Sequence, residues 1–185
     1  LHDKKMISET FFSEKERKMV DILSDIIIPK DDNSGSATEA GVPDFIEFMM
    51  KDYPKFQTPM RGGLMWLENL SLATFDRSFT EINAEQRITL IDQIAYPDTA
   101  EEEMKFGVKF FNLIRNLTCT GFFTSQMGIK DLGYVGNRPN QWNGVPNEVL
   151  EKFGLSYDER TLEVCLKIED QQKIAHWDAE GNLIG

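Results

Sequence analysis

Few residues in this 185-residue sequence are of the types that most often do acid–base, nucleophilic or metal chemistry. There are two histidines, His2 and His176, and two cysteines, Cys119 and Cys165. The cysteines do not form a CxxC redox pair and lack the spacing of a zinc site. Two interpretations of them stay open: a disulfide formed in an oxidising compartment, or two small buried hydrophobic residues. Neither interpretation is catalytic.

The motifs that usually mark catalytic or cofactor sites are absent from the sequence. It contains no GxSxG, HExxH, Walker A or CxxCH motif, and no GxGxxG after a predicted strand. The adjacent acids Asp31 and Asp32 lack the regular oxygen ligands and the later bidentate glutamate of an EF-hand. We therefore predict no catalytic, cofactor-binding or metal-binding residues in this chain.

The composition is that of an ordinary globular domain with an acidic surface. Hydrophobic residues make up 41% and charged residues 28% of the chain, and the length corresponds to about one domain. The 20 basic and 31 acidic residues give a net charge of −11, which repels phosphate backbones and anionic lipid headgroups. The densest apolar run stops at Pro29, far short of the ~20 residues of a transmembrane helix. The sequence therefore disfavours nucleic-acid binding and direct membrane insertion.

Apolar residues at helical spacing, bounded by capping residues and prolines, predict five helices. Ser13 and Glu16 form a capping-box pattern, and Asn83 and Gln86 form a similar pair. Prolines end several of the helices because the residue before a proline is displaced from the α region. The helices are expected between Ser13 and Pro29, from Pro43 to Pro54, from beyond Pro59 to Phe75, from Asn83 to Pro97, and from a cap at Asp98–Thr99 to about Thr118.

The segment from Gly121 to Pro146 departs from the helical pattern and predicts a long ordered loop. It reads GFFTSQMGIKDLGYVGNRPNQWNGVP, with five glycines, two prolines and four aromatic residues. A flexible linker would be polar, so the aromatic residues indicate a loop that packs against something. Two interpretations stay open: the loop covers its own domain, or it contacts a partner.

The end of the chain, KIAHWDAEGNLIG, has two apolar runs around Glu180–Gly181–Asn182 and predicts a small C-terminal β-hairpin. The predicted fold class is mainly α: a single-domain bundle of about five helices with the long aromatic and glycine-rich loop and the hairpin. We expect an N-terminal arm over residues 1–12, a helical domain over 13–155 and a tail over 156–185. Because the chain starts with Leu1 instead of methionine, we also expect that a leader preceded it and was removed.

Several short motifs stand in a specific order along the chain. FFSEKERKMVDILSDIIIP, AGVPDFIEFMM and GGLMWLENLSLATFDRSF come first, followed by the INAEQRITLIDQIA helix. The most specific parts lie in the loop: Gly121-Phe122-Phe123-Thr124-Ser125, Leu132-Gly133-Tyr134, Gly136-Asn137, and Trp142 with Gly144. In these motifs, residues 11 to 147 resemble the gluconate 2-dehydrogenase subunit 3 family.

This resemblance implies a non-catalytic small subunit of an oxidoreductase complex. Such subunits accompany a large FAD-containing catalytic subunit of the glucose–methanol–choline (GMC) type, often together with a cytochrome subunit that carries haem c. The resemblance thus implies that the FAD belongs to the partner, that this chain holds no cofactor, and that the complex is periplasmic. Family members commonly carry a twin-arginine leader that exports the flavoprotein alongside. The printed sequence departs from that pattern, because it contains no twin arginine.

The resemblance and the aromatic loop together point to interface residues instead of catalytic ones. The partner-interface candidates are Phe122, Phe123, Tyr134, Asn137 and Trp142, and the leading anchors are Tyr134 and Trp142 because tyrosine and tryptophan give a large contact area at low entropy cost. We expect the chain to bind and stabilise the FAD-containing subunit of a periplasmic sugar, gluconate or glucoside dehydrogenase complex and to assist its export. Two rival hypotheses are a stand-alone enzyme acting on a sugar and a transient export chaperone for the flavoprotein.

Overall fold

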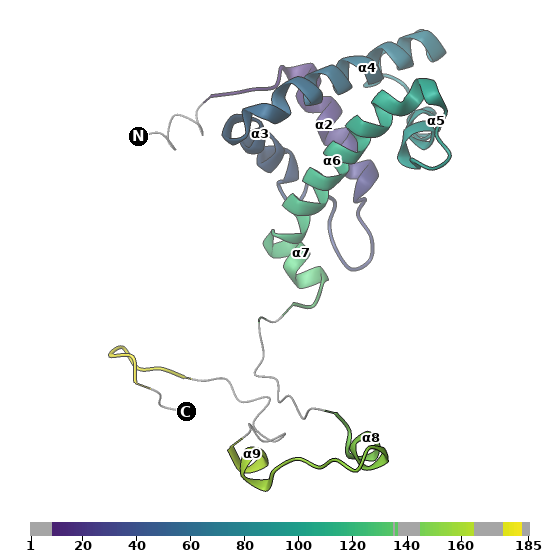
Figure 1. The fold of residues 1–185 in the computed structure, drawn as a ribbon. Coiled ribbons are helices and arrows are strands. Elements are labelled where there is room, and N and C mark those ends of the chain that lie inside the picture. The colour runs from purple at the N-terminus through teal and green to yellow at the C-terminus, as the bar shows by residue number, and fades with distance from the viewer. Residues whose placement is uncertain (1–8, 135, 137–144, 165–175, 183–185) are drawn as a thin grey trace. The chain divides into compact units, whose positions relative to one another are not determined.

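The structure is a computed structural model of residues 1–185, and it describes residues 9–134, 136, 145–164 and 176–182 (Figure 1). The chain divides into two compact units, Leu1–Tyr134 and Val135–Gly185. The sequence pattern predicts that the helical domain ends at residue 155, whereas this division falls after residue 134. Each unit is described by itself.

The first helix of the larger unit, α2 (Glu14–Ile27), begins where the capping box predicts it. The Ser13 side chain accepts a hydrogen bond from the Glu16 N–H, and the Glu16 carboxylate accepts one from the Ser13 N–H. These two bonds satisfy donors that a helix start otherwise leaves unpaired. The buried face of α2 carries Met19, Val20 and Leu23 at helical spacing.

Prolines shape the next two helices in different ways. Pro43 lies in the first turn of α3 (Val42–Asp52), where its missing N–H costs nothing. The 3₁₀ turn η1 (Pro54–Phe56) follows, and α4 (Gln57–Phe75) begins directly after it. Pro59 is therefore inside the first turn of α4, and the predicted break at this proline is wrong. The reason is the same: a first-turn proline removes an N–H that has no partner within the helix.

The fourth predicted helix begins where the sequence pattern places it, whereas the start of the fifth is predicted only in part. Asn83 and Gln86 form the capping box of α5 (Ala84–Ala95). Asp98 and Thr99, however, lie in a turn that is followed by η2 (Glu102–Met104) and then by α6 (Lys105–Phe123). The Thr99 N–H donates to the Tyr96 carbonyl, so these residues close a turn and do not cap α6. The prediction of their capping role is wrong.

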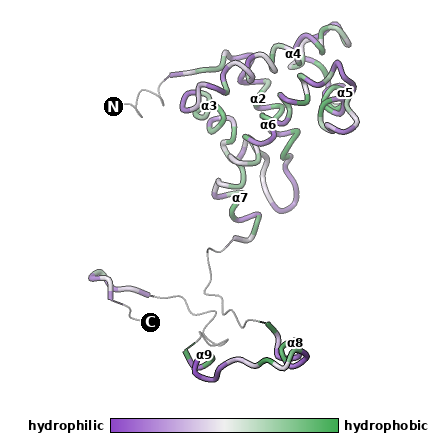
Figure 2. Tube along the Cα trace, in the orientation of Figure 1, coloured by the Kyte–Doolittle hydropathy of each residue, from purple (hydrophilic) through white to green (hydrophobic). Residues whose placement is uncertain are grey.

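Helix α6 is the centre of the larger unit, because it packs against α2, α3, α4 and α5 (Figure 1). Hydrophobic residues recur along each of these helices (Figure 2) and meet in one continuous core. Phe12 belongs to this core, and the Arg61 guanidinium lies 4.1 Å from the centre of the Phe11 ring. The end of the predicted N-terminal arm is thus part of the packed body. The largest fully buried side chains include Phe79, Phe122, Leu23, Ile46, Leu67 and Ile114.

Two glycines let α4 and α6 approach closely. A Cβ atom on Gly63 would lie 1.9 Å from the Cδ2 atom of Phe110, and one on Gly107 would lie 2.3 Å from the Trp66 ring. Both distances are far below van der Waals contact, so a side chain at either position would force its neighbours to shift. The helix-propensity cost of a glycine is therefore offset by packing.

The helical structure continues beyond Thr118, where sequence analysis ends it. Helix α6 runs on to Phe123, and α7 (Gln126–Asp131) follows after a two-residue break. The first part of the predicted loop is therefore helical, while residues 135 and 137–144 of the loop lie outside the described residues. The main prediction, a mainly α fold built around five helices, is confirmed by α2 to α6.

The smaller unit contains two short helices, α8 (Asn147–Lys152) and α9 (Glu159–Val164). The part of the chain that the structure describes contains no extended strand. Near the C-terminus, the Asp178 N–H donates to the Asn182 carbonyl across a tight turn in which Gly181 has a φ of +85°. This turn coincides with the predicted hairpin turn. The flanking residues 165–175 and 183–185 lie outside the described residues, so the hairpin stays a prediction.

Candidate partner interface

The predicted interface residues that the structure describes lie at the junction of α6 and α7. Ser125 ends the break between these helices and caps α7, accepting a hydrogen bond from the Gly128 N–H. A Cβ atom on Gly128 would lie 2.1 Å from the Phe122 carbonyl oxygen. Because α7 rests directly on the backbone of α6 at this point, only glycine fits there. The junction therefore holds α7 in a fixed position at the end of the core.

The motif Leu132-Gly133-Tyr134 ends α7 in a Schellman arrangement. The Tyr134 N–H donates to the Ile129 carbonyl, and the Gly133 N–H donates to the Lys130 carbonyl. Gly133 has a φ of +62°, a conformation that glycine adopts without strain. Part of the family-like signature thus has a local structural reason, which is to stop the helix and turn the chain.

Apolar side chains are exposed around the junction of α6 and α7. Phe123, Ile129, Leu132 and Tyr134 are all exposed to solvent, with Leu132 at 61%. We call these four residues the α7 surface. Exposed apolar groups gathered in one region mark interaction sites more often than single ones do. Neither Ile129 nor Leu132 is among the predicted interface residues, although their three-residue spacing places them on the same face of a short helix.

Phe122 does not belong to this surface, because its side chain is buried in the core, and its contact with a partner stays a prediction. Its side chain is only 1% exposed, whereas that of Phe123 is 38% exposed. The two rings meet edge to face, with centroids 5.2 Å apart. Consecutive residues of a helix point about 100° apart, so one of the pair enters the core while its neighbour faces solvent.

A hollow of about 370 Å³ lies beside α7. Residues 33–35 of the loop between α2 and α3 form one wall, and Gln126, Met127, Lys130 and Asp131 of α7 form the other. Gly35 approaches the Met127 side chain so closely that a Cβ atom would lie 3.0 Å from the methyl carbon. Other residues of α7 than those of the α7 surface thus line a recess against the loop between α2 and α3.

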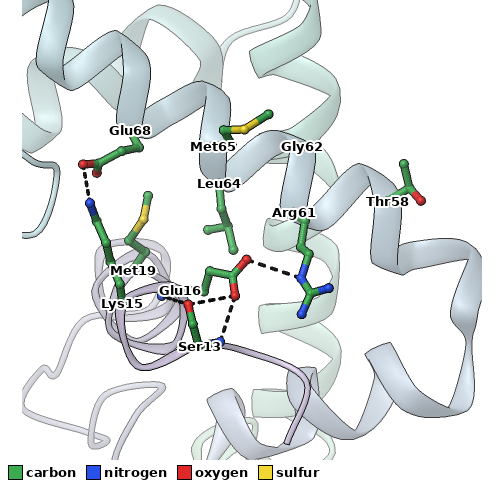
Figure 3. Close-up of a pocket in the computed structure, with 10 residues that line it drawn as sticks. All are labelled: Ser13, Lys15, Glu16, Met19, Thr58, Arg61, Gly62, Leu64, Met65 and Glu68. Carbon is green, nitrogen blue, oxygen red and sulfur yellow. Dashed lines mark hydrogen bonds and ion pairs between the residues drawn. The ribbon is translucent and has the colours of Figure 1, made fainter.

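A second and larger recess, of about 660 Å³, lies between α2 and α4 (Figure 3). Its apolar lining comes from Met19, Leu64 and Met65, and ion pairs join the two helices at its ends (Figure 3). The Lys15 ammonium lies 2.7 Å from the Glu68 carboxylate. A looser pair joins Arg61 to Glu16 at 3.4 Å. Because these rim charges are paired, the recess suits an apolar side chain better than an ion.

Glu68 holds three parts of the fold together. Burial acts to raise the pKa of its carboxyl, but hydrogen bonds from the Lys15 ammonium, the Phe79 N–H and the Ser78 hydroxyl outweigh it. The pKa of Glu68 therefore lies below its ordinary value. This acid is a structural bridge between α2, α4 and the residues that follow α4.

The described residues include no cluster of groups that could hold a metal ion. No three of their His, Cys, Asp and Glu side chains are close enough together to hold a metal ion. Asp31, considered above for a cation site, instead accepts hydrogen bonds from the Asn33 and Ser34 N–H groups and closes a turn. These bonds lower the pKa of its carboxyl.

The structure describes only some of the other predicted site residues. Cys119 is half-buried on α6, whereas Cys165 lies outside the described residues, so their pairing stays a prediction. Asn137 and Trp142 also lie outside the described residues. None of the helices that the structure describes is both long and apolar enough to span a membrane.

The described fold and surfaces define a class of protein: a helical domain that exposes several apolar side chains around the junction of α6 and α7. Comparison with known families gives a match for residues 14–144 to a family described as Gluconate 2-dehydrogenase subunit 3. The match covers well over half of the chain, and the chain belongs to this family. No curated protein and no solved structure matches it. Its family is that of a subunit of a multi-subunit dehydrogenase complex.

Proposed function

We propose that this chain is the non-catalytic small subunit that binds and stabilises the FAD-containing catalytic subunit of a periplasmic GMC-type sugar, gluconate or glucoside dehydrogenase. The FAD, and the haem c of a third cytochrome subunit, belong to the partners. The chain also assists export of the folded flavoprotein. Family membership supports the role of a subunit, and the α7 surface is the observation that carries the proposal toward binding.

The α7 surface suits a protein partner for three reasons. It is apolar and exposed on a helix whose position is fixed by contact with the α6 backbone. Preorganised surfaces bind more tightly because less ordering is needed on association. Tyr134 adds an aromatic ring with a polar end, the kind of side chain that is enriched at interfaces. A partner that covers Leu132 and Tyr134 would remove both from water.

The test is co-expression with the GMC-type flavoprotein subunit, followed by purification through a tag on the flavoprotein. The variant Leu132→Ser/Tyr134→Ser should weaken the complex at least tenfold, because central interface anchors carry most of the binding energy. The control Leu72→Ser/Tyr96→Ser removes the same two residue types from exposed positions elsewhere on the body. The control should bind as the unaltered chain does.

Three outcomes would count against the proposal. If the unaltered chain does not co-purify with the flavoprotein, the subunit role is wrong. If the chain co-purifies from the cytoplasm but is missing from the mature periplasmic enzyme, it is a transient export chaperone. If the purified chain alone turns over a sugar with a dye acceptor, it is an enzyme.

Trp142→Ala should also weaken the complex more than it lowers the stability of the isolated chain.

A further inference from the structure

The described residues of the smaller unit expose nearly all of their large apolar side chains. We call these residues, 145–164 and 176–182, the acidic tail. Phe153 is 73% and Val164 80% exposed, while Leu150 and Tyr157 are half-buried, and none of the tail residues whose burial is described is buried. The exposed large apolar residues of the tail are Val145, Val149, Phe153, Leu155, Leu162, Val164 and Trp177.

The two helices of the tail have defined ends but little to stabilise them. Gly154, with a φ of +68°, ends α8 in a Schellman arrangement, in which the Leu155 N–H donates to the Leu150 carbonyl. The Tyr157 hydroxyl accepts a hydrogen bond from the Val145 N–H. Each helix has six residues, whereas isolated helices shorter than about 12–15 residues are marginal in water. Helices this short are stable when an apolar face packs against another surface.

The charge of the acidic tail limits the kinds of partner surface that it can bind. The tail contains seven acidic and two basic residues, and the whole chain has a net charge of −11. A second copy of the chain would bring two acidic surfaces together, and nucleic acid or an anionic membrane would do the same. A partner surface that is apolar and basic would bury the exposed apolar groups and pair with the acids around them.

We propose that the acidic tail is a second docking surface, which binds an apolar and basic face of the catalytic subunit of the dehydrogenase complex. This inference rests on the function proposed above, because it takes the partner from that proposal. It adds a contact that the family match does not cover, since the match ends at residue 144. Phe153 and Val164 are the anchors of this surface, one at the end of each helix.

The experiment compares three full-length chains for binding to the co-expressed flavoprotein subunit. Phe153→Ser/Val164→Ser should weaken binding at least tenfold. The control Tyr96→Ser/Leu72→Ser, again one aromatic and one aliphatic residue from the exposed surface of the body, should leave binding unchanged. In hydrogen exchange, the amides of residues 148–164 should become protected in the complex and not in the isolated chain.

Charge is tested with Glu148→Gln/Glu151→Gln/Glu163→Gln. Raising the salt concentration from 50 to 500 mM should weaken binding of the unaltered chain, and it should weaken binding of this variant less, because exposed charges are screened by salt. Equal salt dependence of the two chains would show that the acids do not face a basic surface and would overturn that part of the proposal.

The remaining outcomes separate this proposal from the function on which it rests. If the unaltered chain binds the flavoprotein and the Phe153→Ser/Val164→Ser variant binds equally well, the tail is not a docking surface, but the subunit role stands. If the unaltered chain does not bind, both fail. Protection of residues 148–164 in the isolated monomer would show that the tail packs on its own chain. A dimer that this variant converts to a monomer would show that the occupant is a second copy.

Discussion

The two short helices α7 and α8 are alike in local structure and opposite in surroundings. Each has six residues, and each ends in a glycine with positive φ and a Schellman pair of hydrogen bonds. Gly128 of α7, however, lies against the Phe122 backbone and is buried, whereas α8 contains no buried residue. Sequence signals for helix ends thus work equally well in both places. They do not decide whether a helix joins a core.

The difference extends to the parts of the chain in which the two helices lie. The body around α2 to α6 buries its apolar residues in one cluster, while the acidic tail exposes its own. We infer that the body supplies most of the stability of the chain, and the proposals above assign a contact role to α7 and the tail. The predictions below test this division, beginning with the change that should cost most.

The first prediction tests the boundary between the core and the α7 surface by comparing the adjacent residues Phe122 and Phe123. Phe122→Ala should lower the free energy of unfolding by about 3–5 kcal/mol, because it removes a fully buried ring. Phe123→Ala should lower it by no more than about 1 kcal/mol, since that ring is partly exposed. Urea denaturation of the two variants measures both values. Similar losses for both would contradict the assignment of Phe122 to the core.

The second prediction concerns the adjacent glycines of α4. Gly63→Ala should lower the free energy of unfolding by about 1–3 kcal/mol. The new Cβ atom would overlap the Phe110 ring near the Cβ atom of Phe110, where the ring cannot move away. Gly62→Ala should instead stabilise by up to about 1 kcal/mol, since its Cβ would make an ordinary contact at 3.5 Å and alanine favours helix. Thermal unfolding gives the signs. A stabilising Gly63→Ala would mean that α4 and α6 are not so closely packed.

The third prediction is that the stability of the body depends on pH. The pKa of Glu68 is lowered in the folded chain, so the carboxylate contributes stability at pH values above its ordinary pKa, and this contribution is lost as the pH falls through the folded value. Glu68→Gln should therefore cost about 1 kcal/mol at pH 7, and the cost should disappear near pH 3. Thermal unfolding at the two pH values measures the change.

Glu151→Gln, in the exposed α8, is the control for this measurement and should not alter the unfolding temperature of the isolated chain at either pH. A cost of Glu68→Gln that persisted at low pH would show that Glu68 acts through packing instead of charge.

The smallest expected effect belongs to the tail. In the isolated chain, Phe153→Ser/Val164→Ser should change the free energy of unfolding by less than about 0.5 kcal/mol, because both side chains are already exposed to water. A loss of 2 kcal/mol or more would break the comparison, since it would show that the tail contributes to the stability of the isolated protein.

Much of the body follows from local signals in the sequence. The capping boxes at Ser13 and Asn83 start α2 and α5 where the pattern predicts them, because capping uses side-chain and backbone groups three residues apart. Prolines are less decisive. Pro59 lies inside α4, since a proline is excluded from the interior of a helix and not from its first turn. Of the candidate interface residues, Phe123 and Tyr134 are exposed and Phe122 is buried, while their contact with a partner stays a prediction.

The sequence by itself determined the helical class, most helix starts, the acidic charge and the family, because these depend on composition, short spacings and the order of motifs. Only the tertiary structure decided which apolar residues are buried. Burial depends on which helix faces meet, as where Gly63 admits Phe110 or where Gly128 admits the Phe122 carbonyl. The same types of residue form a core in one part of the chain and an exposed surface in another, because burial requires a second surface that no local pattern contains.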